Sequence, residues 1–298
     1  QVCVRNVQQG RPVQIGRLQR YAVDGLMASP DNLIFERAPA SGRRAAVIGA
    51  GPAGLACAHA LARAGHEVAL FDARPKAGGL NEYGVATYKT AGGYAQRENE
   101  WLLGVGGIRL QCGWRLAGRE QFESLRREYD ALFLGLGLAE THGLGVPGET
   151  LAGVEDAVEW ISTLRQAADP GTVPVGRRVL VIGGGMTAVD AAVQSRLLGA
   201  ESVDMVYRRG PQQMRASQHE QDLARTRGVR ILHWLAPVEI IGEGGSVRAV
   251  RFARQRLDAD RLVPAGEECV LEADTVLKAI GQRLGNPVLV ECGLTLRD

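Results

Sequence analysis

Two segments of the chain carry small residues at the spacing that proteins use to hold the phosphates of a dinucleotide. The first reads GAGPAG, from Gly49 to Gly54. Gly49 permits a tight strand-to-helix turn, Gly51 lets the backbone approach a diphosphate, and Gly54 lets the helix pack close to the sheet. The unpaired N–H groups and the dipole of the following helix favour a negative charge. The spacing therefore predicts a diphosphate-binding turn.

An acidic residue follows the first turn at the position that selects the ribose. Asp72 lies 23 residues after Gly49, at the end of the next expected strand. A carboxylate accepts hydrogen bonds from ribose hydroxyls and repels a 2′-phosphate, so this turn favours FAD or NAD over NADP. A strand–helix turn without a ligand is the structural alternative, and the complete order of strand, turn, helix and acid disfavours it.

The second segment has the same spacing but a different neighbour. It reads GGGMTA, from Gly183 to Ala188, and the strand after it ends in Tyr207-Arg208-Arg209. Two guanidinium groups fit a 2′-phosphate by bidentate, charge-assisted bonds, and Arg215 is near enough in sequence to join them. These arginines could instead belong to a solvated loop face. Their adjacency at the specificity position favours NADPH.

Two different dinucleotide sites in one chain suggest a bound flavin and a visiting pyridine nucleotide, with hydride passing between them. Orientation and electrostatics suffice for this reaction, so we predict no catalytic side chain. The five cysteines are odd in number and form no CxxC motif, so neither a redox dithiol nor a metal site is predicted. Reduced thiols, and with them a cytoplasmic location, are the simpler interpretation.

The elements that must position these turns alternate between strand and helix. Around the first turn we expect a strand at 45–48, a helix at 55–64 and a strand at 68–72. Around the second turn the corresponding ranges are 178–182, 187–198 and 203–207. The duplicated βαβ pattern predicts an α/β fold with two doubly wound, Rossmann-like dinucleotide-binding domains.

The remaining elements complete four predicted regions. A helix is expected at 154–167, and alternating segments at 238–241 and 247–256 suggest an antiparallel excursion. The predicted regions are an N-terminal helix and linker (1–42), an FAD-binding domain (43–143), an NAD(P)H-binding domain (144–280) and a truncated return to the FAD domain (281–298).

Composition excludes several other classes of protein. Glycine supplies 39 of 298 residues, roughly twice the usual share, without the period of collagen. The net charge of +2 shows no nucleic-acid footprint. Residues 45–62 lack charge but contain glycine and proline breaks, so a membrane span is not expected. The chain begins at Gln1 without a signal peptide and is interpreted as an excised fragment.

Several longer stretches resemble a known family. VIGAGPAGLACAHALARAGHEVALFDARPKAGGL, GVPGE, VLVIGGGMTAVDAA and AIGQ are similar to the flavoprotein subunits of glutamate synthase and dihydropyrimidine dehydrogenase. PVQIGRLQRYAVD, ALFLGLGLAE and VYRRGPQQMRASQHE make the bacterial dihydropyrimidine dehydrogenase side the closer resemblance. The resemblance implies FAD, NAD(P)H, and iron–sulfur clusters that relay electrons to a pyrimidine-reducing partner subunit in a hetero-oligomer.

The resemblance also assigns individual positions. Those that match flavin-contacting positions are Gly49, Gly51, Ala53, Gly54, Asp72, Gly79, Leu80 and Lys89. Those that match nucleotide-contacting positions are Gly185, Met186, Thr187, Ala188, Arg208, Arg209, Arg215 and Gly281. Lys89 replaces a frequent arginine and is expected to keep a positive charge near the diphosphate. Some bacterial relatives prefer NADH, so NADH stays possible beside NADPH.

Two departures from the family limit what this chain is expected to do alone. Cys3 and Gln19 lie where the last cluster-binding segment of the family ends, and the upstream cysteines are absent. A [4Fe–4S] cluster needs about four ligands, so none is expected here. The chain also stops at Asp298, before the family's Gly-Asp motif that closes over the flavin, so we expect FAD to bind weakly. A glutamate synthase small subunit and a non-catalytic nucleotide-binding module remain the alternatives.

Four residues outside the turns invite functional interpretation. Asp190 either contacts a ribose or stabilises the first turn of its helix. His219 and Glu220 are expected on a solvated helix face. Trp114 is expected to be a packing residue rather than a flavin-stacking one.

Overall fold

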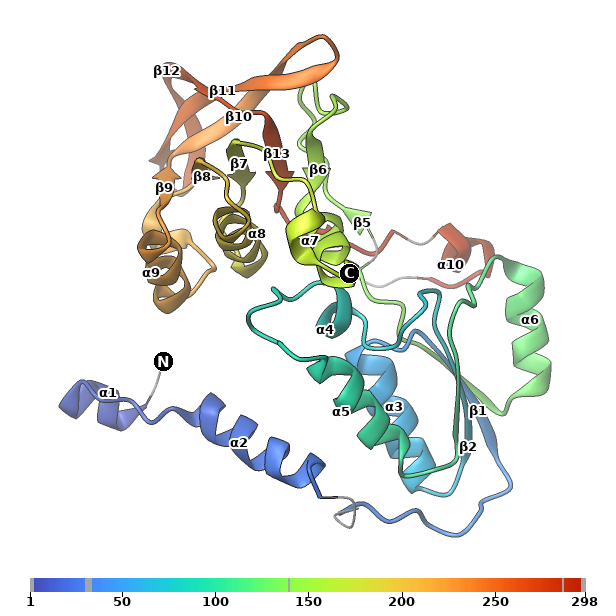
Figure 1. The fold of residues 1–298 in the computed structure, drawn as a ribbon. Helices are drawn as coiled ribbons and strands as arrows, with labels where there is room; N and C mark the ends of the chain where they lie inside the picture. Colours follow the sequence, from blue (N-terminus) through green and yellow to red (C-terminus); the bar gives the residue numbers. More distant parts are fainter. Residues whose placement is uncertain (1–2, 30–33, 139, 286, 296–298) are drawn as a thin grey trace.

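The structure is a computed structural model that describes residues 3–29, 34–138, 140–285 and 287–295. Two lobes, each built on a parallel sheet, lie side by side, and a helical arm extends away from the first lobe (Figure 1). The predicted α/β fold with two parallel, Rossmann-type sheets is confirmed. Among the described residues, no helix combines the length and the apolar character needed to cross a bilayer.

The first sheet has the strand order β3-β2-β1-β4, and all its pairs are parallel. Because side chains alternate between its faces, Val47, Val68 and Leu70 pack under one group of helices while Ala69 and Phe71 face the other. The strands are β1 (Arg44–Ile48), β2 (Glu67–Phe71), β3 (Ile108–Gln111) and β4 (Ala131–Leu134). The helices are α3 (Pro52–Arg63), α4 (Leu80–Tyr83) and α5 (Tyr94–Leu103), with α6 (Arg119–Glu128) and α10 (Pro287–Glu291) by the second face.

The second sheet has the order β6-β13-β7-β8-β9 and is also parallel. Three helices cover one face and a three-stranded antiparallel sheet covers the other, so this sheet is buried on both sides. The strands are β6 (Val154–Asp156), β7 (Arg178–Ile182), β8 (Ser202–Tyr207), β9 (Val229–His233) and β13 (Thr275–Lys278). The covering elements are α7 (Ala157–Gln166), α8 (Met186–Leu197), α9 (Gln218–Thr226), β10 (Leu235–Glu243), β11 (Ser246–Asp258) and β12 (Arg261–Glu272).

The connections between the lobes pair with one another. β5 (Glu140–Thr141) and β14 (Gln282–Arg283) form an antiparallel two-stranded sheet where the chain leaves and re-enters the first lobe. Two short 3₁₀ helices, η1 (Pro170–Thr172) and η2 (Pro211–Gln213), complete the second lobe.

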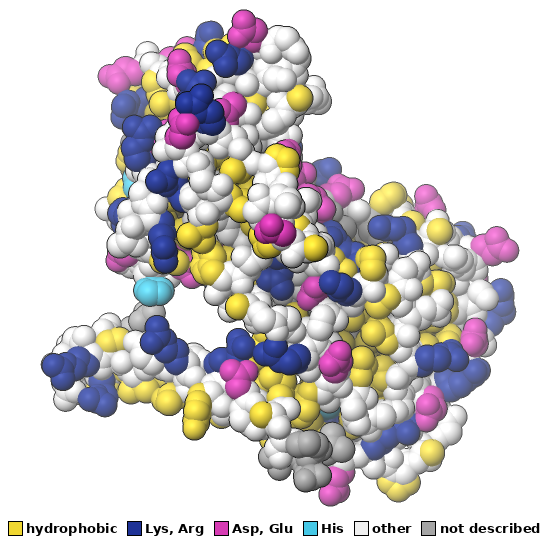
Figure 2. Space-filling model, in the orientation of Figure 1, with side chains coloured by type: hydrophobic (Ala, Val, Ile, Leu, Met, Phe, Trp, Pro, Cys, Tyr) yellow, Lys and Arg dark blue, Asp and Glu magenta, His cyan; other side chains and the backbone are white. Residues whose placement is uncertain are grey.

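The N-terminal arm contains α1 (Val4–Gln9) and α2 (Ile15–Met27). Figure 2 shows hydrophobic side chains exposed along it, and Ile15 and Leu18 are more than half exposed. The Arg20 guanidinium carbon lies 3.4 Å from the centre of the Tyr94 ring, which attaches α2 to α5.

Several local expectations differ from the structure. The helix predicted from residue 154 begins only at Ala157, because the three residues before it form the edge strand β6. The antiparallel excursion has a third strand, β12, that sequence alternation did not indicate. The arm has two helices where one was expected.

Candidate functional site

The first glycine turn joins β1 to α3 through a close approach of backbone to backbone. Gly49 has a φ of +103°, and a Cβ at this position would overlap the carbonyl oxygen of Gly135, just after β4. A Cβ on Gly54 would in turn overlap the carbonyl oxygen of Gly49. Both positions therefore require glycine for steric reasons, as the motif predicts.

A second pair of glycines lies against the same turn. Gly79 has a φ of +51°, and a Cβ there would stand 2.7 Å from the Cα of Gly51. The Gly78 N–H donates to the Ala50 carbonyl oxygen at 2.7 Å. Gly51 caps α3 without any side-chain hydrogen bond, so the first-turn N–H groups stay available for an anion. This arrangement fits a diphosphate, with exposed Ala53 and Leu80 beside it.

The Asp72 side chain stabilises the first glycine turn by hydrogen bonds to the backbone. Its Oδ2 accepts a hydrogen bond from the Ala50 N–H at 2.7 Å, and its Oδ1 accepts one from the Arg74 N–H at 2.8 Å. Each carboxylate oxygen can accept more than one hydrogen bond, so a ribose hydroxyl remains a possible second donor. Sequence reasoning missed the supporting role because the spacing indicates only where Asp72 lies.

Lys89 lies between two carboxylates of the other lobe. Its Nζ stands 2.6 Å from Asp190 Oδ1 and 3.0 Å from Glu220 Oε1, and Asp190 also accepts from the Tyr88 hydroxyl at 3.2 Å. Burial and the Asp190 carboxylate raise the pKa of Tyr88, so it stays protonated and donates. The expectation of a solvated Glu220 is wrong, since its side chain is only 12% exposed. A contact between Lys89 and a flavin diphosphate stays a prediction.

The second glycine turn repeats the first in the other lobe. Gly183 has a φ of +155°, and a Cβ there would overlap the carbonyl oxygen of Ala279, just after β13. Gly185 caps α8 without a side-chain hydrogen bond, and its Cα faces open space. Ala188 lies in the core beneath α8 and is fully buried, so the predicted contact between Ala188 and a nucleotide stays a prediction.

A hollow of about 630 Å³ opens at this turn. It is lined by seven of the residues that the sequence assigned to a nucleotide, while Met186 stands beside them at the start of α8, 42% exposed. The seven are Gly183, Gly185, Thr187, Arg208, Arg209, Arg215 and Gly281. Sequence reasoning missed other lining residues that no motif marks, among them His142, Leu144, Ala236 and Pro237.

The three arginines of this hollow have side chains without a polar partner in the described part of the chain. Within the described residues, the side chains of Arg208, Arg209 and Arg215 make no hydrogen bond and no ion pair, whereas Arg230 forms two short bonds to Asp204. Three unpaired guanidinium groups beside an uncapped helix start produce a positive site. The arrangement can bind a multiply charged phosphate ligand.

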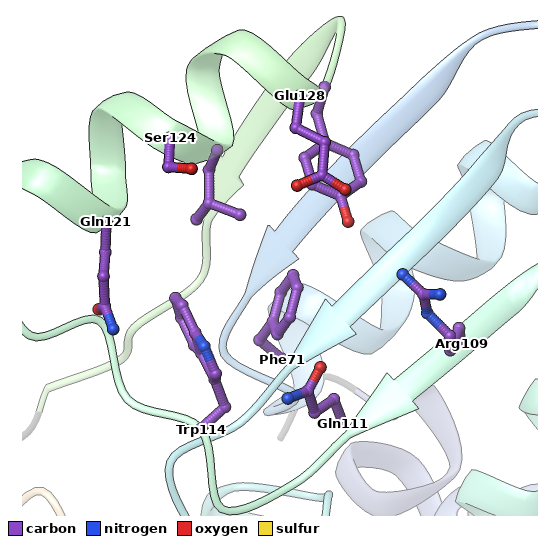
Figure 3. A pocket seen from close by; sticks show the side chains of 9 residues that line it. Phe71, Arg109, Gln111, Trp114, Gln121, Ser124 and Glu128 are labelled. Carbon is purple, nitrogen blue, oxygen red and sulfur yellow. The ribbon is translucent and has the colours of Figure 1, made fainter.

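Another hollow, of about 310 Å³, lies beneath α6 on the far face of the first sheet from α3 (Figure 3). Trp114 lines it and packs on Phe71 with ring centres 4.6 Å apart, in keeping with the expected packing role. None of the residues predicted to bind a cofactor lines this hollow. Among the described residues, no group of three or more His, Cys, Asp or Glu side chains could hold a metal.

Comparisons with known proteins agree with this geometry. The family model described as pyridine nucleotide-disulphide oxidoreductase matches residues 43–298. A glutamate synthase [NADPH] small chain from Halomonas elongata is 34% identical over 90% of this chain and 60% of its own length. The β subunit of an NADP⁺-dependent formate dehydrogenase from Moorella thermoacetica is 34% identical over 81% of this chain and 35% of its own length. The chain thus spans about a third to three fifths of these two relatives.

Solved structures share the fold. Mycobacterium tuberculosis FprA in complex with NADPH superposes with a TM-score of 0.69 at 21% identity, covering 83% of this chain and 71% of that one. Thioredoxin reductase from T. acidophilum gives a TM-score of 0.58 at 21% identity, covering 80% and 77%.

Proposed function

The chain belongs to the pyridine nucleotide-disulphide oxidoreductase family, and from this premise we propose that it binds FAD in residues 43–143 and NADPH in residues 144–280. It would then pass electrons from NADPH through the flavin to a partner subunit. A cytoplasmic location and a hetero-oligomer are part of the proposal, and relatives named as small or β subunits support the partner.

One observation carries the choice of NADPH at the second turn. Arg208, Arg209 and Arg215 line the same hollow as the glycine turn and lack partners among the described residues. The first turn has Asp72 in the equivalent place. A carboxylate repels a 2′-phosphate and guanidinium groups attract it, so the first turn suits FAD and the second suits NADPH.

The residues divide the work of binding and orientation. The N–H groups at the start of α3, with Gly51 and Gly79 close to them, would hold the flavin diphosphate. The start of α8 would hold the diphosphate of NADPH, and the arginines its 2′-phosphate. FAD, when bound, supplies the hydride-accepting ring, and no acid or base from the chain is required.

The most direct test is anaerobic reduction of the FAD-loaded chain. NADPH should bleach the flavin absorbance near 450 nm at lower concentration than NADH does. Equal efficiency with both nucleotides would contradict the NADPH assignment. If neither nucleotide reduces the flavin or an artificial electron acceptor, the alternative of a non-catalytic nucleotide-binding module is favoured.

The final acceptor is a separate question. The sequence resemblance to bacterial dihydropyrimidine dehydrogenase supports pyrimidine (uracil or thymine) reduction by an iron–sulfur partner. Relatives named as glutamate synthase small chains, at 32–34% identity, support the alternative of a glutamate synthase small subunit. With each partner subunit supplied, NADPH-driven uracil reduction is expected, and glutamine-dependent glutamate formation instead would select the alternative.

A further inference from the structure

The loop that carries the three arginines is held in place by backbone and aromatic contacts rather than by its charges. We call residues 208–216 the arginine loop; it joins β8 to α9 and contains only the short helix η2. Because Arg208, Arg209 and Arg215 lack side-chain partners among the described residues, the position of each guanidinium group depends on how this loop is fixed.

Tyr207 attaches the far part of the loop to the glycine turn. Its ring packs against Gly184, where a Cβ would stand 2.5 Å from the ring carbon Cδ2. Its hydroxyl donates a hydrogen bond of 2.8 Å to the carbonyl oxygen of Gln213. Gly184 in turn accepts from the N–H groups of Arg215 at 3.1 Å and Ala216 at 3.0 Å. The turn and the loop are therefore one connected unit.

Trp234 holds the near part of the loop. It has a φ of +63°, a left-handed conformation that is uncommon for a bulky residue and persists where the surroundings enforce it. Its N–H donates to the Arg209 carbonyl oxygen at 3.3 Å, and its ring packs on Gly210, where there is no room for a Cβ. The Gln255 N–H donates to the Trp234 carbonyl oxygen at 2.7 Å, so β11 supports this contact.

We infer that Tyr207 is a positioning residue that sets the preference of the second site for a 2′-phosphate, by holding Arg215 and its loop against the glycine turn. The inference rests on the proposed NADPH site and assigns a new residue to it. A loop that is already ordered binds its ligand without the entropic cost of being fixed on binding. Without the Tyr207 hydroxyl, part of this entropic cost must be met when the ligand binds. The loss of affinity is expected to be largest for a ligand with a 2′-phosphate, because that group contacts the arginine loop.

The test uses two fragments of the nucleotide on the full chain, so it needs neither flavin nor hydride transfer. Binding of 2′,5′-ADP and of 5′-ADP is measured by calorimetry for the wild type and Tyr207→Phe. This variant keeps the ring on Gly184 and loses only the hydroxyl. We expect 2′,5′-ADP to bind about fivefold more weakly, the value of one neutral hydrogen bond, with less than a twofold change for 5′-ADP.

Tyr83→Phe is the matched control. The Tyr83 hydroxyl also bonds to backbone, accepting from the Lys76 N–H at 3.0 Å and donating to its carbonyl oxygen at 3.3 Å, but it lies in the first lobe. It should leave both affinities unchanged. In an Arg215→Ala background, Tyr207→Phe should cause no further loss of 2′,5′-ADP affinity, because the hydroxyl acts through the loop.

The outcomes separate this inference from the proposed function. Equal weakening of both ligands by Tyr207→Phe would indicate a purely structural role, and unchanged affinities for both ligands would also overturn the inference. In both cases a wild type that prefers 2′,5′-ADP leaves the NADPH proposal intact. A wild type without that preference overturns the NADPH assignment and the role of Tyr207 together.

Discussion

The two glycine turns have the same construction in different lobes. In each, the first glycine packs against a carbonyl oxygen just after the last strand of its sheet in chain order, Gly135 after β4 for the first turn and Ala279 after β13 for the second. In each, a glycine caps a helix of twelve residues without a side-chain hydrogen bond. What they share is therefore suited to the diphosphate that all dinucleotides carry.

The turns differ in the residues that follow the second strand. The Asp72 carboxylate is already engaged by two backbone N–H groups, whereas the arginines after β8 have no side-chain partner among the described residues. Under the proposed function, discrimination between nucleotides is thus separate from phosphate binding. An engaged carboxylate rejects a 2′-phosphate by charge, and free guanidinium groups select it by charge and geometry.

The largest expected effect comes from removing the selective charges of the second turn. Arg208→Ala with Arg209→Ala should weaken NADPH binding by about 3 kcal/mol, or roughly a hundredfold, because each charge-assisted bond contributes ~1.5–3 kcal/mol. NADH binding should change little. The measurement is the dissociation constant of each nucleotide.

Arg256→Ala with Arg261→Ala is the control for net charge. Both arginines lie on β11 and β12, and neither lines the hollow. This pair should leave the NADPH affinity nearly unchanged. Equal losses for NADPH and NADH in the Arg208, Arg209 variant would show that the 2′-phosphate is bound elsewhere.

The last position of the two motifs differs, because Gly54 ends the first and Ala188 ends the second. Gly54→Ala should lower the free energy of unfolding by about 2 kcal/mol, since the added methyl overlaps the Gly49 carbonyl oxygen. The variant should also lose FAD, because relief of the overlap moves the turn. Urea unfolding and the flavin content after gel filtration measure the two effects.

Gly16→Ala is the matched addition of one methyl group. Gly16 lies in α2 with no neighbour within 4 Å of a built Cβ, so the change should be neutral or slightly stabilising. If the Gly54→Ala variant is as stable as the wild type, the first turn tolerates an alanine at this position, as the second turn does with Ala188.

Asp72→Asn tests whether the Asp72 side chain stabilises the first turn through its hydrogen bonds, apart from any effect of its charge on a nucleotide. In Asp72 the two carboxylate oxygens accept hydrogen bonds from the Ala50 and Arg74 N–H groups. Asparagine keeps one accepting oxygen and replaces the other by an NH₂ group that cannot accept, so one of the two N–H donors loses its partner. We expect a loss of about 1.5 kcal/mol in the free energy of unfolding. Urea unfolding without nucleotide measures it, and an unchanged stability would mean that Asp72 does not support the turn.

The sequence predicts what depends on local spacing. The glycines, Asp72 and the adjacent arginines follow a pattern within about 25 residues, and the parallel sheets follow from the repeated βαβ units. Lys89 shows the limit, because its partners Asp190 and Glu220 lie more than 100 residues away and belong to the other lobe. No sequence periodicity predicts these ion pairs, because they depend on how the two lobes pack against each other.

Tyr207 shows the same limit at short range. Its place at the end of β8 follows from the strand pattern, but its contact with Gly184 depends on the pairing of β7 with β8. The sequence therefore indicates several of the residues that line the hollow at the second turn but not what holds them in place. Trp234 is a further example, since its left-handed backbone has no signature in sequence.

The smallest expected effect on ligand binding concerns Ala188, which takes in the second turn the place that Gly54 has in the first. Ala188 is fully buried beneath α8, so Ala188→Gly removes one buried methyl group from the core and lowers helix propensity. Each cost is about 1 kcal/mol, so together they should lower the free energy of unfolding by about 2 kcal/mol, with NADPH affinity nearly unchanged. If Ala188→Gly instead tightens NADPH binding, the alanine limits how closely the phosphates approach α8, and the two turns differ in their fit to a diphosphate as well as in their charges.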